Sequence, residues 1–272
     1  MPTTRIDWPD LPAPARALVE EHIGRITAFR TAGAGLNSEV AAVLDTVNGR
    51  VFLKGVPLAR KTLAACQRRE AAVNPFVLAV TPALLWSGEA EGWNLLAFEY
   101  VDSRHADYRP GSTDLDGIVE VLNRLHKIAA PDLPEIRRAE QRWSSWDTGD
   151  YAELFVGDRL LHTDFAGHNV LIGTDDHAAW MVDWAWATTG AGFIDPACLI
   201  IRLIDAGHSA KGAETWARRC DAWAAAEPRA VDAFAEACVR MWNEIAKNGP
   251  AVWTRSMARS AHKWAAYRRG MR

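Results

Sequence analysis

One short block, His162–Ile172, constrains this chain more than any other part of its sequence. It reads HTDFAGHNVLI, and the segment MVDW follows it closely. Asp164 and Asn169 are separated by four residues on a loop that runs into a predicted strand, and Asp183 ends the next predicted strand. A hairpin formed by these two strands would bring Asn169 and Asp183 close together, with Asp164 a short distance away.

The residue types in this block indicate a particular chemistry. One carboxylate oxygen and one carboxamide oxygen directed at the same point are hard ligands, which suit Mg²⁺ in a site completed by water and nucleotide phosphates. Asp164 would then be free to accept a proton from a substrate hydroxyl. An Asp on a loop, an Asn five residues later and a second Asp on the metal form the phosphoryl-transfer template of kinases. We therefore expect Asp164 to be a catalytic base, and Asn169 and Asp183 to be metal ligands.

The same template requires a lysine on a strand and a carboxylate that holds it. Lys54 closes the predicted strand 51–54, where it could contact the α- and β-phosphates of a nucleotide. Glu70 lies sixteen residues later, on a predicted helix over 58–72. The sequence therefore predicts an ion pair between Lys54 and Glu70.

Two further segments could contact the phosphates and the base of a nucleotide. The small-residue turn 33–38 offers exposed backbone amides and the Ser38 hydroxyl as a cover for phosphates. The segment 98–101 reads FEYV and ends a predicted buried strand at the junction of two predicted lobes, where free backbone groups could contact adenine.

The pattern along the chain predicts two lobes, 1–101 for nucleotide binding and 102–272 for catalysis and substrate binding. In the first lobe, apolar residues recur at helical spacing over 12–29, and Asn48-Gly49 indicates a hairpin. The second lobe is expected to be mainly helical beyond Asp195-Pro196. The further elements expected are strands at 40–44, 95–101, 170–172 and 180–182, and helices near 114–129, 197–206, 211–226, 229–247 and 250–268.

Composition excludes several classes of protein. A formal net charge of −3 over 272 residues predicts no nucleic-acid partner. The stretch Trp180–Trp186 is among the longest apolar runs, is interrupted by Asp183 and is far too short to cross a bilayer, so no membrane association is expected. The four cysteines are widely spaced, which is typical of reduced thiols and of a cytoplasmic protein.

These motifs resemble those of the aminoglycoside phosphotransferase and choline kinase superfamily. Its catalytic loop reads H-G-D-x-x-x-x-N and its metal motif reads I-D-W or a close variant. Here the first is present from His162 to Asn169, and the second is VDW around Asp183. The resemblance extends over about 30–240. It implies an α+β, protein-kinase-like bilobal fold, with a small antiparallel-sheet N-lobe that carries a helix and a larger, mainly helical C-lobe.

The resemblance also implies an activity. Such an enzyme transfers the γ-phosphate of Mg²⁺-bound ATP or GTP to a hydroxyl of a small molecule, here an aminoglycoside or another antibiotic, which would be an antibiotic-resistance function. We expect a monomer or homodimer. The implied roles are a base at Asp164, metal ligands at Asn169 and Asp183, a phosphate-anchoring pair at Lys54 and Glu70, and hinge backbone groups at Glu99 and Val101.

The chain departs from the family pattern at two positions. Thr163 stands where the family has glycine, and we expect a modest geometric adjustment in this tight loop. Leu199 stands where the family motif D-P-x-x-D-L has its second aspartate, while Asp195 keeps the first. In the family this segment mainly supports the catalytic loop, so the second change affects contacts behind the site more than the chemistry.

Three alternatives stay open at this point. The acceptor could be choline, a sugar or a homoserine-type metabolite, because no residue here identifies it. The chain could be a non-catalytic nucleotide-binding module. It could also be a metal-dependent hydrolase, with ligands His162, Asp164, His168 and Asp183, although this would leave Lys54 and Glu70 unexplained.

Overall fold

The computed structural model describes residues 5–33, 38–147 and 151–271, and the chain divides into two compact units. The first unit comprises Met1–Ser103 together with the short segment Val182–Ala185. The second unit comprises Arg104–Met181 and Trp186–Arg272. Each unit is described separately.

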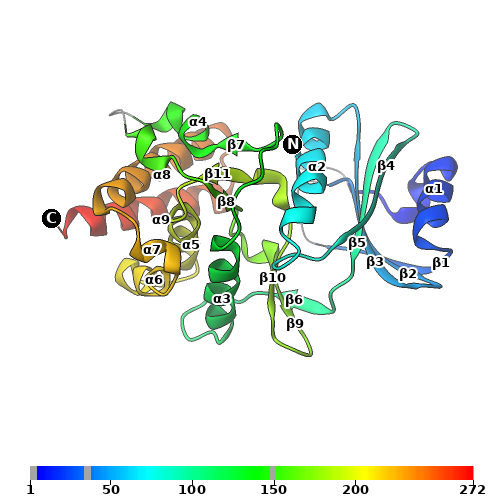
Figure 1. Cartoon of the computed structure of the whole chain (residues 1–272), viewed down its shortest axis with the longest axis horizontal. Helices are drawn as coiled ribbons and strands as arrows, with labels where there is room; N and C mark the ends of the chain where they lie inside the picture. The colour runs from blue at the N-terminus through cyan, green and yellow to red at the C-terminus, as the bar shows by residue number, and fades with distance from the viewer. Residues whose placement is uncertain (1–4, 34–37, 148–150, 272) are drawn as a thin grey trace. The chain divides into compact units, whose positions relative to one another are not determined.

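The first unit is built on a five-stranded sheet in the order β1-β2-β3-β5-β4, in which every neighbouring pair is antiparallel (Figure 1). The predicted hairpin at Asn48-Gly49 joins β2 to β3, with Thr46 opposite Gly49. The elements of this unit are η1 (Trp8–Asp10), α1 (Ala13–Ile23), β1 (Ile26–Thr31), β2 (Val40–Thr46), β3 (Gly49–Pro57), α2 (Lys61–Val73), η2 (Asn74–Phe76), β4 (Leu84–Ala90) and β5 (Trp93–Glu99).

The two faces of this sheet carry different side chains, because successive residues of a strand point to opposite sides. Val51 and Leu53 of β3 pack with Val19 of α1 in one apolar core. Lys54 therefore lies on the opposite face, where α2 packs against β3 and β5. This alternation places the one lysine of β3 beneath a helix that can hold it.

The predicted helix over 12–29 is wrong beyond Ile23. Helix α1 ends at Ile23, because Gly24 follows with φ 95°, a conformation that favours glycine. Residues Ile26–Thr31 instead form β1, which pairs with β2 at the edge of the sheet. The apolar spacing that fits a helix here also fits a strand, and tertiary pairing decides between them.

From Arg104 onward most of the chain forms the second unit. It contains two three-stranded sheets, ordered β10-β9-β6 and β7-β11-β8. Its elements are β6 (Ser103–His105), α3 (Asp114–His126), β7 (Arg137–Arg138), α4 (Ala139–Arg142), η3 (Ser144–Trp146), η4 (Ala152–Phe155), β8 (Arg159–Leu161), η5 (Gly167–Asn169), β9 (Val170–Gly173), β10 (Ala179–Met181), β11 (Thr188–Gly190), α5 (Ile194–Asp205), α6 (Ala210–Ala217), α7 (Asp221–Ala224), α8 (Pro228–Asn248) and α9 (Val252–Arg269). The short helix η6 (Trp184–Trp186) begins in the segment that belongs to the first unit.

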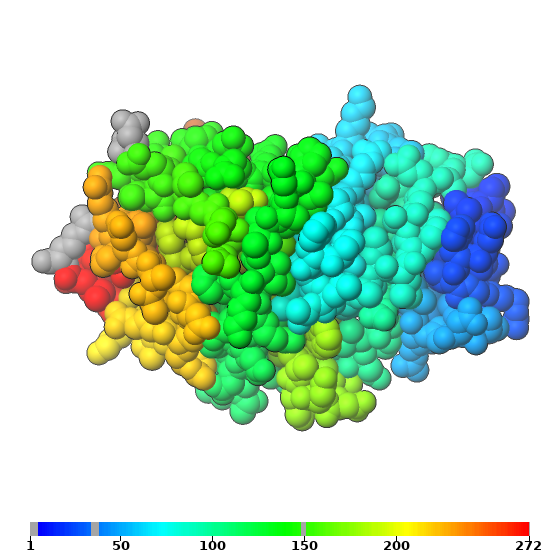
Figure 2. Space-filling model, viewed as in Figure 1, coloured from blue at the N-terminus to red at the C-terminus, as the bar shows by residue number. Residues whose placement is uncertain are grey.

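Helices provide most of the packing in this second unit, as the sequence predicted. Helix α5 packs against α6, α8 and α9, and the large buried side chains of Phe234 and Trp264 lie among them. Helix α3 packs against α6 and α7, and Figure 2 shows these helices together on one face. The single helix predicted over 211–226 is two helices, since α6 stops at Ala217 and α7 begins at Asp221.

Within the described ranges, no helix combines the length and the apolar character needed to span a bilayer.

Candidate functional site

In the first unit, three charged residues meet on the α2 face of the sheet. Lys54 Nζ donates to both carboxylate oxygens of Glu70, at 2.8 and 3.0 Å. Asp183 Oδ1 lies 3.7 Å from the same ammonium group. The side chains of Lys54, Glu70 and Asp183 are only 12%, 5% and 19% exposed. One cation is thus held between two carboxylates, out of most solvent contact.

The burial of this cluster shapes its charge states. Burial by itself would lower the pKa of Lys54, but the neighbouring Asp183 and Glu70 outweigh that effect and raise it. Burial raises the pKa of Glu70, and the Lys54 ammonium opposes that rise. The lysine therefore stays charged, as a phosphate-binding cation must.

The segment Val182–Ala185 is held to the first unit by its own hydrogen bonds. The backbone amide of Trp184 donates to Glu70, and its indole donates to Thr81 Oγ1 at 3.2 Å. Arg69 Nη1 donates to the carbonyl of Ala185 at 2.5 Å. Asp183 itself has φ 65°, in the left-handed region that non-glycine residues rarely adopt. These bonds around it are what hold Asp183 in that conformation beside Lys54.

Some backbone groups of the predicted hinge, 98–101, already form hydrogen bonds with other parts of the first unit. The amide of Glu99 donates to the carbonyl of Ala83 at 2.9 Å, and a Glu99 carboxylate oxygen accepts from the Ala83 amide at 3.2 Å. The carbonyl of Val101 accepts from Ser103 Oγ at 3.0 Å, whereas its amide has no hydrogen-bond partner in the described parts of the chain. Val101 thus retains a donor that a purine could use.

Residues 34–37 of the predicted phosphate cover lie outside the described residues. Ser38, at its end, is buried, and the neighbouring amide of Glu39 donates to the carbonyl of Gly55 on β3 at 3.0 Å. Ser38 therefore enters the sheet next to the strand that carries Lys54.

In the second unit, Asp164 is fixed by one of its two carboxylate oxygens. Oδ1 accepts from Arg202 Nη2 at 3.0 Å and from the backbone amide of Ala166 at 3.3 Å. Burial alone would raise the pKa of Asp164, but Arg202 and His162 outweigh it, and the pKa lies below its ordinary value. Asp164 is therefore ionised at neutral pH, the state that a general base requires.

Asn169 is oriented by the same loop. Its side-chain nitrogen donates to the carbonyl of Asp164 at 3.2 Å, and its own amide donates to the carbonyl of Ala166 at 2.8 Å. The carboxamide oxygen accepts no hydrogen bond from the described residues. Val170 follows directly and pairs with Met181 at the end of the β9–β10 hairpin. The two ends of this hairpin thus carry Asn169 on one side and lead to Asp183 on the other.

The loop that carries Asp164 rests on Asp195, at the start of α5. Asp195 Oδ2 accepts the amide of His162 at 3.0 Å, and Oδ1 accepts the amide of Thr163 at 2.8 Å. This agrees with the expectation that the D-P-x-x segment supports the catalytic loop. The loss of the second aspartate of that motif, at Leu199, leaves these two bonds in place.

Thr163 takes a strained backbone conformation, with φ 65°. The glycine that related motifs carry here would adopt it without a steric penalty, which explains the preference for glycine. Thr163 is held instead by its hydroxyl, which donates to the carbonyl of Trp186 at 2.9 Å and accepts from Arg142 Nη1 at 2.7 Å. Arg142 is in turn stacked between the rings of Trp143 and Trp186, each at 4.9 Å. At Thr163, the geometric adjustment thus consists of hydrogen bonds of the hydroxyl, which a glycine at this position could not form.

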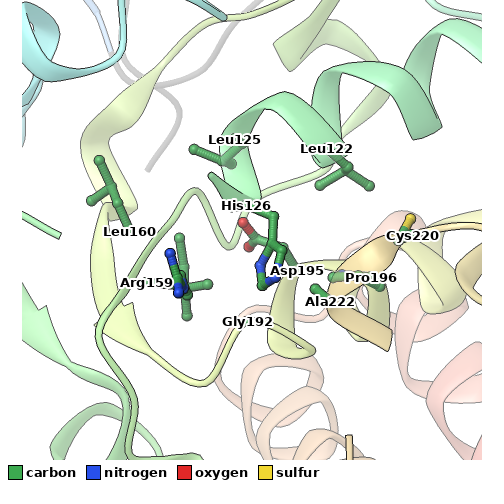
Figure 3. A pocket seen from close by; sticks show the side chains of 11 residues that line it. Leu122, Leu125, His126, Arg159, Leu160, Gly192, Asp195, Pro196, Cys220 and Ala222 are labelled. Atoms are coloured by element: carbon green, nitrogen blue, oxygen red, sulfur yellow. The ribbon is translucent and has the colours of Figure 1, made fainter. Parts of the chain in front are cut away.

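Asp195 is also one of the residues that line a small pocket in the second unit (Figure 3). Leucines of α3 and β8, including Leu122, Leu125 and Leu160, line it together with His126, whose Nδ1 is buried and has no hydrogen-bond partner among the described residues. Asp195 is only 3% exposed, and burial raises its pKa to about 7, against the pull of its two backbone hydrogen bonds and Arg142. The support of the loop therefore changes charge near neutral pH.

The sequence did not identify two arginines that hold this loop, Arg202 and Arg142. For Arg202 a signal exists, because it interrupts the apolar run 199–204 of a predicted helix. A charge placed there would be buried and would need a partner. For Arg142 no comparable signal exists, since it does not interrupt an apolar run and the residues Glu140 and Gln141 before it are polar.

Asn169 in the second unit and Asp183 in the first each carry a donor oxygen of the kind that magnesium prefers. Both offer hard oxygen ligands, and the carboxamide of Asn169 is turned so that its nitrogen is bonded and its oxygen is left to accept. Among the described residues, no group of three or more His, Cys, Asp or Glu side chains is arranged to hold a metal ion. Magnesium, which keeps several waters and takes ligands from nucleotide phosphates, does not require such a group.

Comparison with known proteins by sequence gives no match, either to a family model or to a curated protein. Solved structures with the same fold do match. An aminoglycoside phosphotransferase from Alicyclobacillus acidocaldarius has a TM-score of 0.63 at 14% identity, covering 96% of this chain and 97% of that one. Choline kinase LicA from Streptococcus pneumoniae has a TM-score of 0.61 at 13% identity, covering 94% and 100%.

Macrolide 2'-phosphotransferase MphH from Brachybacterium faecium has a TM-score of 0.56 at 18% identity, covering 92% of this chain and 98% of that one. At these identities the likeness establishes the fold. The chain has the α+β, protein-kinase-like fold predicted from its sequence, and it spans nearly the whole length of these structures.

Proposed function

We propose that this chain is a small-molecule kinase, which transfers the γ-phosphate of ATP or GTP to a hydroxyl of its substrate. The observation that carries the proposal is the buried cluster of Lys54, Glu70 and Asp183. A fully charged lysine held between two carboxylates on the face of an antiparallel sheet is the phosphate-anchoring arrangement of kinases. The likeness of the whole fold to phosphotransferases supports this, as does choline kinase LicA having been solved with AMP.

In this proposal, each residue has one role. Lys54, positioned by Glu70, binds the α- and β-phosphates. Asn169 and Asp183 would hold Mg²⁺, which would supply positive charge against the charge that develops on the phosphates. Asp164 accepts the proton of the attacking hydroxyl.

The remaining roles concern the nucleotide base and the phosphate cover. The free amide of Val101 and the carbonyl of Glu99 would contact the purine. The turn that ends at Ser38 would cover the phosphates. ATP is the first donor to test, and GTP is the second.

The acceptor that we propose is an aminoglycoside or another antibiotic with a free hydroxyl. Structures with this fold include an aminoglycoside phosphotransferase, a macrolide 2'-phosphotransferase and a choline kinase, so choline-, sugar- and homoserine-type acceptors belong in the same test. Since specificity depends on the shape of the pocket, the acceptor has to be found by experiment.

The test is a nucleotide-consumption screen with Mg-ATP and Mg-GTP against aminoglycosides, macrolides, choline, sugars and homoserine. Mass spectrometry then detects the phosphorylated product. Asp164→Ala should lower turnover by at least about 10²-fold while leaving nucleotide affinity nearly unchanged, because the base contacts the acceptor and not the nucleotide. Asp158→Ala, which removes an exposed carboxylate, is the matched control and should leave turnover unchanged.

Two results would contradict the proposal. Full turnover by the Asp164→Ala variant would remove Asp164 as the base. Tight nucleotide binding without turnover on any acceptor would favour a non-catalytic nucleotide-binding module.

A further inference from the structure

The two carboxylate oxygens of Asp164 have different surroundings. Oδ1 is bound by Arg202 Nη2 at 3.0 Å and by the Ala166 amide at 3.3 Å. Oδ2 accepts no hydrogen bond from any described residue. The side chains of Asp164 and Arg202 are 23% and 19% exposed, so this contact is largely shielded from water. One oxygen is therefore fixed, and the other is open to a ligand.

Arg202 is itself held from behind by two other helices. The ring of Trp242, on α8, lies 5.6 Å from the guanidinium carbon, in cation–π contact. Met257 Sδ, on α9, lies 3.5 Å from Nη1. Trp242 is in turn packed edge-to-face against Trp253, with ring centroids 6.1 Å apart. These contacts order the guanidinium before any substrate binds. The cost of ordering a free arginine side chain, about 2 kcal/mol of rotamer entropy, is therefore already met in the folded protein.

From this geometry we propose that Arg202 is a positioning residue, which fixes the rotamer of Asp164 so that only Oδ2 faces the acceptor hydroxyl. The inference rests on the proposed kinase function. The hydroxyl proton passes to Asp164 Oδ2, and the hydroxyl oxygen forms a bond to the γ-phosphorus. The bond from that phosphorus to the bridging oxygen breaks, and its electron pair leaves with the nucleoside diphosphate. Arg202 takes no part in the bond changes.

This role requires the charged hydrogen bond from Arg202 to Asp164 Oδ1. The substitutions at Arg202 should therefore separate the loss of its charge from the loss of its bulk. Arg202→Met keeps much of the packing against Trp242 and Met257 but releases Oδ1. We expect kcat to fall by about 10- to 100-fold, since a misplacement of about 1 Å in a reacting group costs about 10²-fold, while the KM values change by less than about threefold. Arg202→Lys keeps one N–H donor and should recover a large part of the lost kcat.

The matched control is Arg219→Met. Arg219 also forms an ion pair, with Asp116, and also stacks on a tryptophan, Trp216, but it does not contact Asp164. This variant should retain the kcat of the unsubstituted protein. Should Arg202→Met fail to fold, Arg202→Gln replaces it, because glutamine is neutral and leaves Oδ1 without its charged partner.

The probe is Mg-ATP, with ADP release measured both with water as the acceptor and with any acceptor that the screen identifies. A double-mutant cycle with Asp164→Asn adds a second readout, because a residue that acts only through Asp164 should have no further effect once the base is gone. An equal loss of kcat from Arg202→Met in both backgrounds would overturn the positioning role, and so would an unchanged kcat in Arg202→Met alone. If the unsubstituted protein turns over no nucleotide at all, the proposed function fails and this role fails with it.

Discussion

Replacing Asp195 by asparagine tests how the loop that carries Asp164 is supported. Burial raises the pKa of Asp195 from its ordinary value of 3.8 to about 7 in the folded protein. The unfolded chain loses that proton near the ordinary value. Between these two pH values, the folded state binds a proton that the unfolded state has released. The free energy of unfolding should therefore fall as the pH rises through this range.

The size of the effect follows from the shift. One pKa unit corresponds to 1.36 kcal/mol, so a rise of about 3 units corresponds to about 4 kcal/mol. This stabilisation is fully present below about pH 4 and is lost as the pH rises through about 7. Asp195→Asn removes the titration, although it leaves one of the two amides, of His162 or Thr163, without an acceptor at a cost of about 1–3 kcal/mol.

The assay is urea unfolding of both proteins, followed by tryptophan fluorescence at several pH values from 4 to 8. Taking the difference between the two proteins cancels the titration of groups that they share. The free energy of unfolding of Asp195→Asn, relative to that of the unsubstituted protein, should rise by about 4 kcal/mol between pH 4 and pH 8. Asp158→Asn, at an exposed carboxylate, is the control and should give a constant difference. A difference for Asp195→Asn that stays constant within about 1 kcal/mol would refute the reasoning.

Three further substitutions test the remaining parts of the site. Lys54→Met leaves the carboxylates of Glu70 and Asp183 buried without their cation, so the free energy of unfolding in urea should fall by about 3–5 kcal/mol at neutral pH, and a loss below 1 kcal/mol would contradict the buried ion pair. Asp183→Asn should weaken Mg-nucleotide binding at least tenfold in calorimetric titration without unfolding the protein. Thr163→Val keeps the shape and strain of the side chain but removes the hydroxyl bonds, so urea unfolding should show a loss of about 1–3 kcal/mol, larger than that of Thr163→Gly, which also relieves the strained backbone.

The local parts of the fold could be predicted because short patterns determine them. Asn48-Gly49 specifies a tight hairpin, and strand alternation then decides which face Lys54 occupies. Glu70 lies on the next helix, which has to cover that face. The ion pair between Lys54 and Glu70 thus depends on three local rules that agree with one another.

The parts that escaped prediction depend on contacts between segments far apart in the sequence. Residues 26–29 continue an apolar helical pattern, yet they pair with β2 because Gly24 ends the helix. Helix α5 brings Arg202 to a carboxylate that lies 38 residues earlier, and no periodicity encodes that distance. The attachment of Val182–Ala185 to the first unit likewise arises from tertiary hydrogen bonds.

The backbone at the site shows why these tertiary contacts matter for chemistry. Thr163 and Asp183 are two of the non-glycine residues with positive φ in the described parts of the chain, each at 65°. A left-handed conformation costs an ordinary residue about 1–2 kcal/mol, so neither would persist without stabilising contacts. Thr163 is held by Arg142 and Asp195, and the residues next to Asp183 are held by hydrogen bonds to α2. These bonds therefore fix the backbone next to Asp164 in one unit and next to Asp183 in the other, and removing one of them should lower the proposed phosphate transfer before it unfolds the protein.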